Sequence, residues 1–310
     1  MILTVTPNTA VDRVLFFRGF DWGHTTRADD AVWSPGGKGT DVAWILGEMG
    51  YPCLATGLAA GETGRRLQAM IESRGSRVEF VWADGETRTN YVLVDTARNT
   101  QATITVSGLA VRPDHVAALE ATIARELPSS RALVLGGTLP AGMAPDWYIP
   151  WIERARGLGL PVLLDVSGPP LAACARAGAT VLKPNLDELV ELVGRALATQ
   201  QEIVAAAREI LVAGSELVLA SLGSEGALAV TAQQAWYLPP LPVEPVNCAG
   251  AGDALTAGLA QGYAEGWPLE RSLRLAVAAA TAVVITKGTA ECHKEDVDRF
   301  LPQVRMVPVS

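Results

Sequence analysis

Residues 247–259 of the chain are NCAGAGDALTAGL. Gly250, Ala251 and Gly252 carry small side chains or none, so a ligand could approach their backbone closely. The small apolar residues after Asp253 predict a helix that packs tightly against its neighbours. Because the start of a helix has unpaired N–H groups and a partial positive charge, this stretch predicts a phosphate-binding turn.

Asp253 is the residue of this turn that suggests chemistry. A carboxylate next to a bound phosphate repels it, unless the carboxylate accepts a proton from the hydroxyl group that attacks the phosphate. The turn therefore indicates phosphoryl transfer, with Asp253 as the general base. A glycine turn in which Asp253 only caps a core helix fits this motif equally well when the motif is taken alone.

A second glycine-rich turn, SPGGKGTD at 34–41, leads into a helix with apolar residues at 42–49. It is not a Walker A loop, because Val32 stands where that motif has its first glycine and Gly39 where it has serine or threonine. The turn at 250–255 is not a dinucleotide-binding fingerprint either, because Leu255 replaces the third glycine.

The order of elements predicts an α/β fold with a mostly parallel central sheet. Strand-like runs lie at 1–6, 53–59, 77–82, 132–137, 162–168, 180–185, 216–223, 226–232 and 235–243, and helical patterns at 62–75, 115–127, 147–156, 170–178, from 187, and at 201–213. Such alternation calls for parallel strands covered by helices on both faces, with ligands at the carboxyl ends of the strands.

A second group of strands stands apart from this alternation. It consists of runs at 11–17 and 28–33 and a hairpin at 86–95 and 101–106 with its turn at 97–99, and the hairpin is rich in threonine and valine. The polarity of the hairpin on both faces indicates little burial. We expect a small sheet that covers the active site as a lid and excludes water.

Composition limits the class of partner. The net charge of −8 argues against nucleic-acid and anionic-membrane binding, so local basic residues must hold an anionic substrate. The four cysteines are far apart and form neither a disulfide framework nor a zinc site, which favours a cytoplasmic location. The longest apolar run, 275–285, is too short to span a bilayer.

Two further motifs have both a functional and a structural interpretation. In KPNLDE (183–188), Asn185 and Glu188 lie on one helix face, where their oxygens could bind Mg²⁺ directly or through water. The same spacing is a helix capping box, which the motif alone favours. In SLGSEG (221–226), two glycines could let a nucleotide approach, although ordinary turns have the same composition.

Basic and acidic residues outside these motifs suggest an acceptor site. Lys38 in its glycine turn and Arg88 in the lid could together hold a phosphate on the acceptor substrate, with Arg27 as a weaker candidate. Asp12 could accept hydrogen bonds from sugar hydroxyl groups. Each of these residues is more often an ordinary surface or turn residue.

The motifs together resemble those of a known family, in order and approximate spacing, over nearly the whole chain. They are GGKGTDVA (36–43), ETRTN (86–90), GGTLPAG (136–142), LDVSG (164–168), LKPNLDEL (182–189), SLGSEGAL (221–228) and AGAGDALTAG (249–258). The chain resembles the ribokinase-like carbohydrate kinases of the phosphofructokinase B family. TPNTAVDR (6–13) and ETRTN make it most similar to the branch with 1-phosphofructokinase and tagatose-6-phosphate kinase.

The resemblance implies a fold, co-substrates and an assembly. The fold is a ribokinase-like three-layer αβα sandwich formed by a single domain over 1–310, with a β lid from about 10–34 and 86–108. The co-substrates are ATP and Mg²⁺, and the substrate is a small sugar phosphate. Many members of the family form dimers through their lids, so we expect a homodimer here.

The resemblance also implies roles for individual residues. Asp253 is the base, and Gly250, Ala251 and Gly252 form the anion hole. On the nucleotide side it implies Ala249, Gly250 and Gly252, the segment with Ser221, Gly223 and Gly226, and Lys183, with Asn185 and Glu188 as the magnesium element. The residues at the phosphosugar are Asp12, Arg27, Gly37, Lys38, Asp41, Arg88, Asn90 and Thr138.

Three departures from the family pattern stand near the predicted site. Asp41 replaces an asparagine, which puts a carboxylate near the substrate phosphate. Asn247-Cys248 replaces the usual Asp-Thr before the G-A-G-D core, which removes a charge close to the nucleotide phosphates. Gly137 and Thr138 belong to a GGT segment where the family has S-G-S.

We therefore expect an ATP-dependent kinase that phosphorylates a hydroxyl group of a phosphorylated ketohexose, of the fructose 1-phosphate or tagatose 6-phosphate type. Two alternatives remain open at this stage. One is a kinase of an unphosphorylated sugar or nucleoside, and the other is a non-catalytic sugar-phosphate sensor on the same scaffold.

Overall fold

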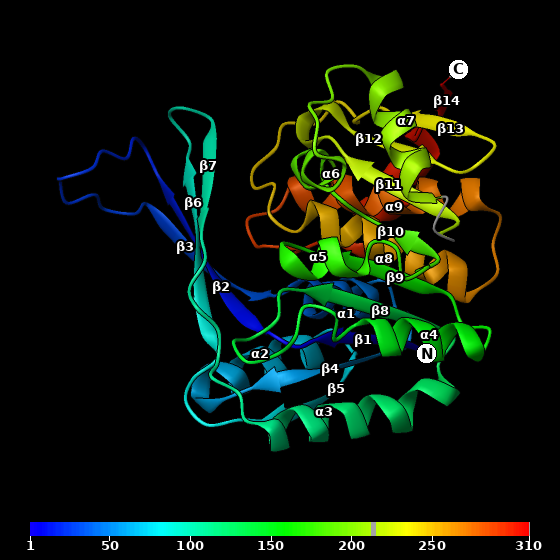
Figure 1. Cartoon of the computed structure of the whole chain (residues 1–310). Helices are drawn as coiled ribbons and strands as arrows, with labels where there is room; N and C mark the ends of the chain where they lie inside the picture. Colours follow the sequence, from blue (N-terminus) through cyan, green and yellow to red (C-terminus); the bar gives the residue numbers. More distant parts are fainter. Residues whose placement is uncertain (212–214, 310) are drawn as a thin grey trace.

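A ten-stranded sheet forms the centre of the molecule in the computed structural model, which describes residues 1–211 and 215–309 (Figure 1). The strand order is β14-β13-β12-β11-β10-β9-β8-β1-β4-β5. The strands are β1 (Ile2–Thr6), β4 (Cys53–Ala59), β5 (Arg77–Trp82), β8 (Ala132–Gly137), β9 (Val162–Val166), β10 (Val181–Leu182), β11 (Leu217–Ser221), β12 (Ala227–Val230), β13 (Ala235–Leu238) and β14 (Val307–Pro308). Neighbours from β5 to β11 are parallel, and β12, β13 and β14 continue the sheet antiparallel.

Helices cover both faces of this sheet. One hydrophobic core lies under α1 (Lys38–Glu48), α2 (Gly61–Ser73), α8 (Ala251–Ala264), α9 (Leu269–Val284) and α10 (Lys294–Phe300). The other lies under α3 (Pro113–Glu126), α4 (Ile149–Gly157), α5 (Pro169–Cys174), α6 (Leu186–Val193) and α7 (Gln200–Leu211). Strands such as β1 and β4 are buried at every residue, as expected for a parallel sheet covered on both sides. The predicted three-layer α/β fold is therefore confirmed.

Four strands form a smaller sheet, which we call the lid sheet and which stands beside the body in Figure 1. Its order is β3-β2-β6-β7, from β3 (Asp30–Gly36), β2 (Ala10–Phe17), β6 (Arg88–Asp95) and β7 (Thr100–Ile104). The β6–β7 hairpin matches the predicted one, and β7 is exposed along its whole length. The inner face carries a small cluster of Val14, Phe16, Val92 and Val94, against which Ala249 packs.

The outer face of the lid sheet carries a row of larger side chains. Trp33 of β3 pairs with Arg13 of β2, Arg13 pairs with Tyr91 of β6, and Tyr91 pairs with Ile104 of β7. Because residues directly opposite each other project from the same face, these four side chains form one row across the sheet. Trp33, Tyr91 and Ile104 are exposed although they are large and apolar.

Some element boundaries differ from the predictions. The strand predicted at 235–243 ends at Leu238, because Pro239 and Pro240 cannot donate hydrogen bonds to a neighbouring strand. The helix predicted at 170–178 ends at Cys174. The last residues of the helix predicted at 201–213 lie outside the described residues. The apolar run at 275–285 forms most of α9 and packs in the core, and among the described helices none is long and apolar enough to cross a membrane.

The strand order places a crevice beside β1. From β1 the chain first continues on one side, through β4 and β5, and later returns to the other side with β8. Ligands of open α/β sheets bind at such a reversal, at the carboxyl ends of the strands. Asn8, just after β1, donates from Nδ2 to Oγ1 of Thr138, just after β8, at 2.9 Å. This contact joins the two strand ends at the reversal.

Candidate active site

The turn before α8 has a backbone that only glycine fits at Gly250. Its φ of +85° lies in the left-handed region, and a Cβ there would lie 2.3 Å from the backbone nitrogen of Ala290. The buried Asn247 holds the turn from its other side. Its Oδ1 accepts from the N–H of Ala249 at 2.9 Å, and its Nδ2 donates to the carbonyl of Lys287 at 3.0 Å. An aspartate at 247, as in the family pattern, could not donate to the carbonyl of Lys287. Asn247 therefore makes a hydrogen bond that the usual residue cannot make.

The first turn of α8 faces accessible space. Ala251, Gly252 and Asp253 are all partly accessible, whereas the residues after them are buried. The N–H groups of Gly252 and Asp253 belong to the first turn, which offers them no carbonyl acceptor within the helix. A side chain at Gly252 would lie 3.2 Å from Nζ of Lys183, so an ammonium group is next to these amides. The ammonium group of Lys183 and the N–H groups of Gly252 and Asp253 thus lie together at the predicted anion hole.

Asp253 has an unusual protonation equilibrium. Burial and the neighbouring Asp165 carboxylate raise the pKa of Asp253 to about 7, while the charges of Lys38 and Lys183 act in the opposite direction. A general base works best when its pKa lies near the working pH. The position, accessibility and pKa of Asp253 all suit a base that acts at neutral pH.

Asp165 joins two lysines to α8. Its carboxylate, 1% exposed, lies 2.6 Å from Nζ of Lys38 and 3.0 Å from Nζ of Lys183, and accepts from Oγ1 of Thr256 at 3.0 Å. Burial alone would raise the pKa of Asp165, but the two ammonium groups lower it below the usual range. Asp165 is not among the residues predicted from the sequence. Its signal was the LDVSG motif at the carboxyl end of a predicted strand.

Lys38 contacts two carboxylates of the site. Besides Asp165, its Nζ lies 3.7 Å from Oε1 of Glu188. Arg88, with which Lys38 was predicted to hold the acceptor phosphate, instead donates to the carbonyls of Asn8 and Val106, both at 3.2 Å. Lys38 and Arg88 thus have different partners here, and their shared role at the acceptor phosphate stays a prediction.

Arg88 and two neighbouring lid residues, all predicted to bind the acceptor, form a polar cluster on the lid sheet. Nδ2 of Asn90 donates to Oδ1 of Asp12 at 3.0 Å across the parallel β2–β6 pair. Burial raises the pKa of Asp12, and the Asn90 hydrogen bond and the Arg88 charge lower it. Burial also lowers the pKa of Arg88, and the Asp12 charge counteracts this effect. The β2–β6 pair thus brings a carboxylate, an amide and a guanidinium group together.

Asp41 stands in the first turn of α1, after the N-cap Gly37 with φ of +98°. Its side chain is 3% exposed and makes hydrogen-bonding contact with Asp253. Burial, and then the charge of Asp253, raises the pKa of Asp41 well above its usual value. The structure thus brings two predicted site residues, from α1 and α8, into direct contact.

Asn185 and Glu188 form the capping box of α6. Oδ1 of Asn185 accepts from the N–H of Glu188, and Oε2 of Glu188 accepts from the N–H of Asn185, each at 2.8 Å. The second carboxylate oxygen of Glu188, Oε1, makes no hydrogen bond within the described part of the chain and has only the ion pair with Lys38 at 3.7 Å. Among the described residues no three acidic, histidine or cysteine side chains gather as a metal site. The arrangement fits a Mg²⁺ ion bound mainly by nucleotide phosphates and water, which is common for this ion.

The remaining predicted residues differ in where they lie. Ser221 ends β11 and forms a bridge with Asn185, and the space beside Gly223 is open. At Gly226 a Cβ would lie 2.2 Å from the carbonyl oxygen of Leu238, so strand packing already requires glycine there. Arg27 is exposed in the loop between β2 and β3, at the end of the lid sheet opposite to Asp12, and does not join the other residues.

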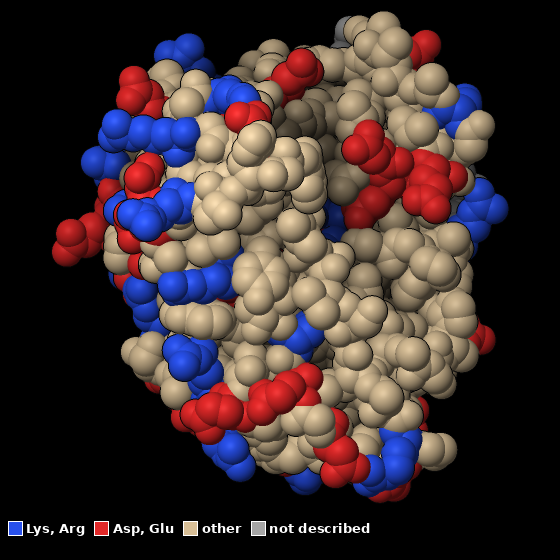
Figure 2. Space-filling model, turned by 90° about the vertical axis from the view of Figure 1, so that its left-hand side faces the viewer, with Lys and Arg blue, Asp and Glu red and all other residues tan. Residues whose placement is uncertain are grey.

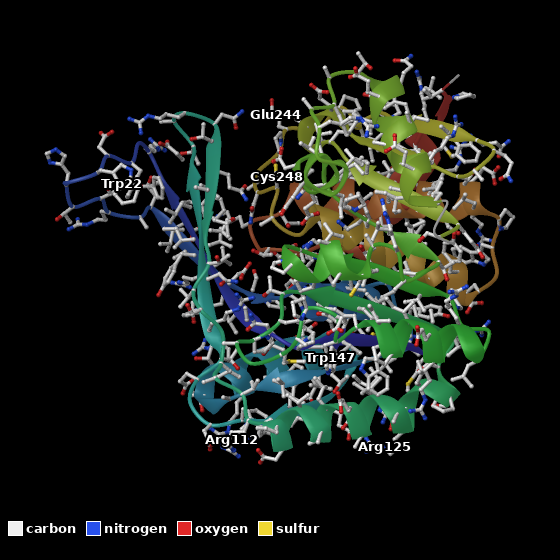
Figure 3. The ribbon with its side chains drawn as sticks, in the orientation of Figure 1. Trp22, Arg112, Arg125, Trp147, Glu244 and Cys248 are labelled. Carbon is white, nitrogen blue, oxygen red and sulfur yellow. The ribbon has the colours of Figure 1, made fainter. Side chains whose placement is uncertain are left out.

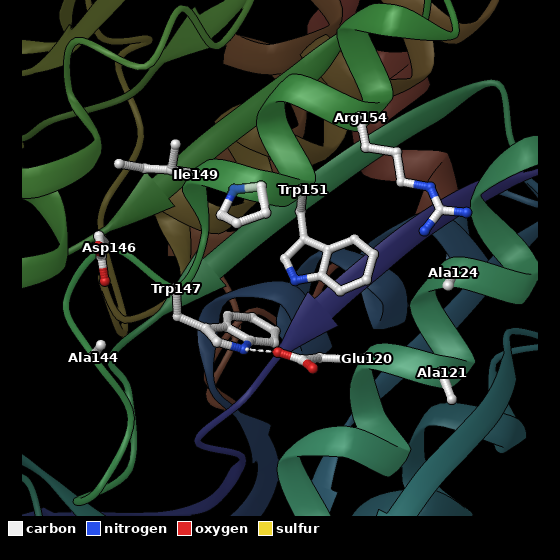
Figure 4. Close-up of a pocket in the computed structure, with 10 residues that line it drawn as sticks. Glu120, Ala121, Ala124, Ala144, Asp146, Trp147, Ile149, Trp151 and Arg154 are labelled. Atoms are coloured by element: carbon white, nitrogen blue, oxygen red, sulfur yellow. Dashed lines mark hydrogen bonds between the residues drawn. The ribbon is translucent and has the colours of Figure 1, made fainter.

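A separate cavity lies elsewhere. It measures about 640 Å³ between α3 and the start of α4, and Figure 4 shows Trp147 of its wall donating to Glu120, at 2.9 Å. It contains none of the predicted site residues. The glycine turn before α8 lies elsewhere, and in Figure 3 its neighbour Cys248 is on the side of the body next to β7. Seen from the lid side, the surface is hollowed between the lid sheet and an acidic patch on the body (Figure 2).

Comparison with known proteins agrees with this geometry. The model of the pfkB family carbohydrate kinases matches residues 7–296, which include both glycine turns and the whole lid sheet. The chain belongs to the PfkB family. Like other PfkB proteins, it is an ATP-dependent carbohydrate kinase, as the motifs predicted.

Curated PfkB relatives match along nearly the whole chain. A 1-phosphofructokinase of Haloferax volcanii is 36% identical over 299 residues, which cover 96% of this chain and 95% of the relative. The ATP-dependent 6-phosphofructokinase isozyme 2 of Mycobacterium tuberculosis is 33% identical, covering 96% and 88%. The crystal structure of phosphofructokinase-2 from Escherichia coli with substrates and products superimposes with a TM-score of 0.90 at 28% identity, covering 97% and 98%.

Proposed function

We propose that this PfkB protein transfers the γ-phosphoryl group of ATP to a hydroxyl group of a phosphorylated ketohexose, of the fructose 1-phosphate or tagatose 6-phosphate type. One observation carries the proposal: Asp253, with a pKa of about 7, stands at the open N-terminus of α8 beside Lys183. The names of the relatives, which are sugar-phosphate kinases, favour a phosphorylated acceptor.

The chemistry follows from the positions of these groups. The oxygen of the acceptor hydroxyl bonds to the γ-phosphorus of ATP, and Asp253 accepts the proton of this hydroxyl. The bond between the γ-phosphorus and the bridging oxygen breaks, and ADP leaves with that oxygen. The amides of Gly252 and Asp253 and the ammonium group of Lys183 stabilise the charge on the transferred group. When bound, Mg²⁺ would neutralise nucleotide phosphates, held by Glu188 and Asn185 directly or through water.

We further propose that 1–310 is a single catalytic domain whose lid sheet closes over the acceptor. Asp12, Asn90 and Arg88 lie at the end of the lid sheet next to the body, where a sugar phosphate would enter. Closure would exclude water from the reacting groups. The row of Trp33, Arg13, Tyr91 and Ile104 on its outer face would pair with the same row of a second copy.

Replacing Asp253 tests its role as the base. In Asp253→Asn we expect turnover about 100-fold or more below the wild-type value, because the amide cannot accept the proton. Binding of ATP, measured by calorimetry, should remain near the wild-type value. Near-normal turnover in a folded Asp253→Asn protein would exclude Asp253 as the base.

Arg88 distinguishes a phosphorylated acceptor from a free sugar. A coupled assay of ADP formation over a panel of sugars and sugar phosphates should show turnover only with phosphorylated ketohexoses. Arg88→Ala should raise KM for the sugar phosphate about tenfold or more, because a guanidinium–phosphate contact is lost. Arg125→Ala is the matched control, since this exposed arginine of α3 lies far from the lid sheet in Figure 3.

The outcomes separate the alternatives. A kinase of an unphosphorylated sugar or nucleoside would turn over such an acceptor, and Arg88→Ala would leave its KM unchanged. A sensor would bind a sugar phosphate without any ADP formation over the whole panel.

A further inference from the structure

Asp41 is a buried acidic side chain of the site that forms no salt bridge among the described residues. Lys38 and Lys183 both bind Asp165, and Lys38 also approaches Glu188. Arg88, on β6, donates to backbone carbonyls and acts on Asp12. No salt bridge within the described residues includes Asp41.

The groups around Asp41 are acidic. Asp253 of α8 touches it, and Asp12 of β2 and Asp165 of β9 also disfavour a negative charge at this place. The side chain is 3% exposed, and its Oδ1 is buried without a hydrogen-bond partner in the described structure. A buried carboxylate oxygen without a partner costs far more free energy when the group is charged than when it is neutral.

The contact between Asp41 and Asp253 also requires a proton. Two ionised carboxylates repel each other at hydrogen-bonding distance, whereas one proton shared between them makes a strong hydrogen bond. Asp253 is partly accessible and close to Lys183, so the negative charge is more favourable there. Asp41 is enclosed, so the proton belongs on Asp41.

We propose that Asp41 is a positioning residue kept as a neutral carboxylic acid, whose O–H donates to the Asp253 carboxylate and orients it toward the acceptor hydroxyl. The inference rests on the proposed role of Asp253 as the base. A neutral carboxylic acid has nearly the shape of a carboxamide and can likewise donate on one side and accept on the other. Asp41 can therefore do the work of an asparagine, but only while it keeps its proton.

The pH dependence of the reaction should show this proton. Below about pH 7 Asp253 is protonated and cannot act as the base. At alkaline pH the proton of Asp41 leaves as well, and two adjacent negative charges then face the incoming phosphoryl group. The rate should therefore fall on both sides of an optimum, and the alkaline fall should belong to Asp41. The two carboxyl groups titrate as a coupled pair.

Three proteins test the proposal: wild type, Asp41→Asn and Asp41→Ala, each measured as kcat/KM between about pH 6 and pH 10. Asp41→Ala loses the donor and should be at least tenfold slower at every pH. Asp41→Asn should recover most of that loss at the optimum and should lack the alkaline fall seen in wild type. Lys38 and Lys183 remain in both variants, so an alkaline fall that comes from a lysine would persist.

Either of two results would overturn the proposal. One is an alkaline fall that is the same in Asp41→Asn and wild type. The other is an Asp41→Asn enzyme as slow as Asp41→Ala, since a donor of the same shape must restore the rate.

A spectroscopic measurement separates this proposal from the proposed function. Infrared difference spectra of the substrate-free protein at pH 8 should contain the C=O band of a protonated carboxyl group, which should be missing in Asp41→Asn. This band does not depend on any catalysis, so it would remain if the protein were not a kinase. Its absence in wild type would contradict a neutral Asp41 even if the kinase assay succeeds.

Discussion

At the scale of single residues, Gly250 joins the stability of the fold to the function of the site. Its positive φ and its contact with the backbone of Ala290 shape the turn that gives α8 its open N-terminus. The same two features exclude every residue with a Cβ at this position. A substitution here should therefore affect folding and turnover together.

Gly250→Ala should lower the free energy of unfolding by about 2–4 kcal/mol, from backbone strain and from the clash with Ala290. Turnover should fall as well, because the amides of the turn move. Gly266→Ala is the matched control, since Gly266 follows α8 with a similar φ of +66° and open space around it. It should lose only about 1 kcal/mol and keep its turnover. Urea titration of both variants measures the difference, and equal losses would refute the role given to the Ala290 contact.

The raised pKa of Asp253 predicts that the base destabilises the fold. Its usual value is 3.8 and its folded value is about 7, so the folded state holds the proton more tightly than the unfolded state. The associated stability is present below about pH 4 and is lost as pH rises to about 7. Asparagine does not ionise, so the Asp253→Asn protein does not lose this stability as pH rises. Its melting temperature should therefore be higher than that of wild type at pH 8, with a smaller difference at pH 5. Calorimetric scans at both pH values test this; a variant that is less stable at pH 8 would contradict it.

At the scale of elements, the lid sheet holds the catalytic turn directly. Oε1 of Gln101 on β7 accepts from the N–H of Cys248 at 3.0 Å, and Asp30 of β3 pairs with Lys287 at 2.5 Å. Ala249 packs against the inner cluster of the lid sheet. A movement of the lid sheet would therefore shift the backbone at Cys248, and with it the amides of the anion hole.

Gln101→Ala should reduce kcat about three- to tenfold, because the turn loses one of the bonds that fix its amides. The melting temperature should change little, since β7 is exposed. Thr100→Ala is the control on the same strand, where the side chain projects to the opposite face. Steady-state kinetics of both proteins provide the comparison, and an equal effect at 100 and 101 would show that the Cys248 contact has no role.

Local patterns predicted some parts of the site and could not predict others. The helix after Asp253 and the β6–β7 hairpin follow from spacing within one stretch of sequence, and the structure has both. The contact of Lys38 with Asp165 joins residues that are 127 positions apart, so it depends on strand order and not on any local pattern. For the same reason Asp165 was missed. The acceptor and metal roles themselves stay predictions.

At the scale of the whole molecule, the lid sheet presents its outer row to solvent. Trp33, Tyr91 and Ile104 would leave water if two copies met through their lid sheets. A phosphofructokinase-2 from Escherichia coli, 28% identical, has been described in a tetrameric inhibited form, so assembly occurs in a relative. In the proposed homodimer, the crevice of each copy would lie on its own side of the contact between the two lid sheets.

Ile104→Arg tests this assembly. A charge at the β7 end of the row should convert a dimer to a monomer at micromolar concentration, because an unpaired buried cation is costly. Val307→Arg, an equally exposed valine on β14, is the control and should leave the assembly unchanged. Sedimentation velocity measures the mass, and a dimer that survives Ile104→Arg would place the interface elsewhere.

The start of β1 and the short strand β14 both lie on the side of the body away from the lid sheet (Figure 1). Ile2 begins β1, an inner strand of the sheet, and β14 is the edge strand at one end of the sheet. A tether or fluorescent fusion attached to either end would therefore leave the mouth of the crevice facing bulk liquid. Protein immobilised in this way should admit its reactants as freely as protein in solution.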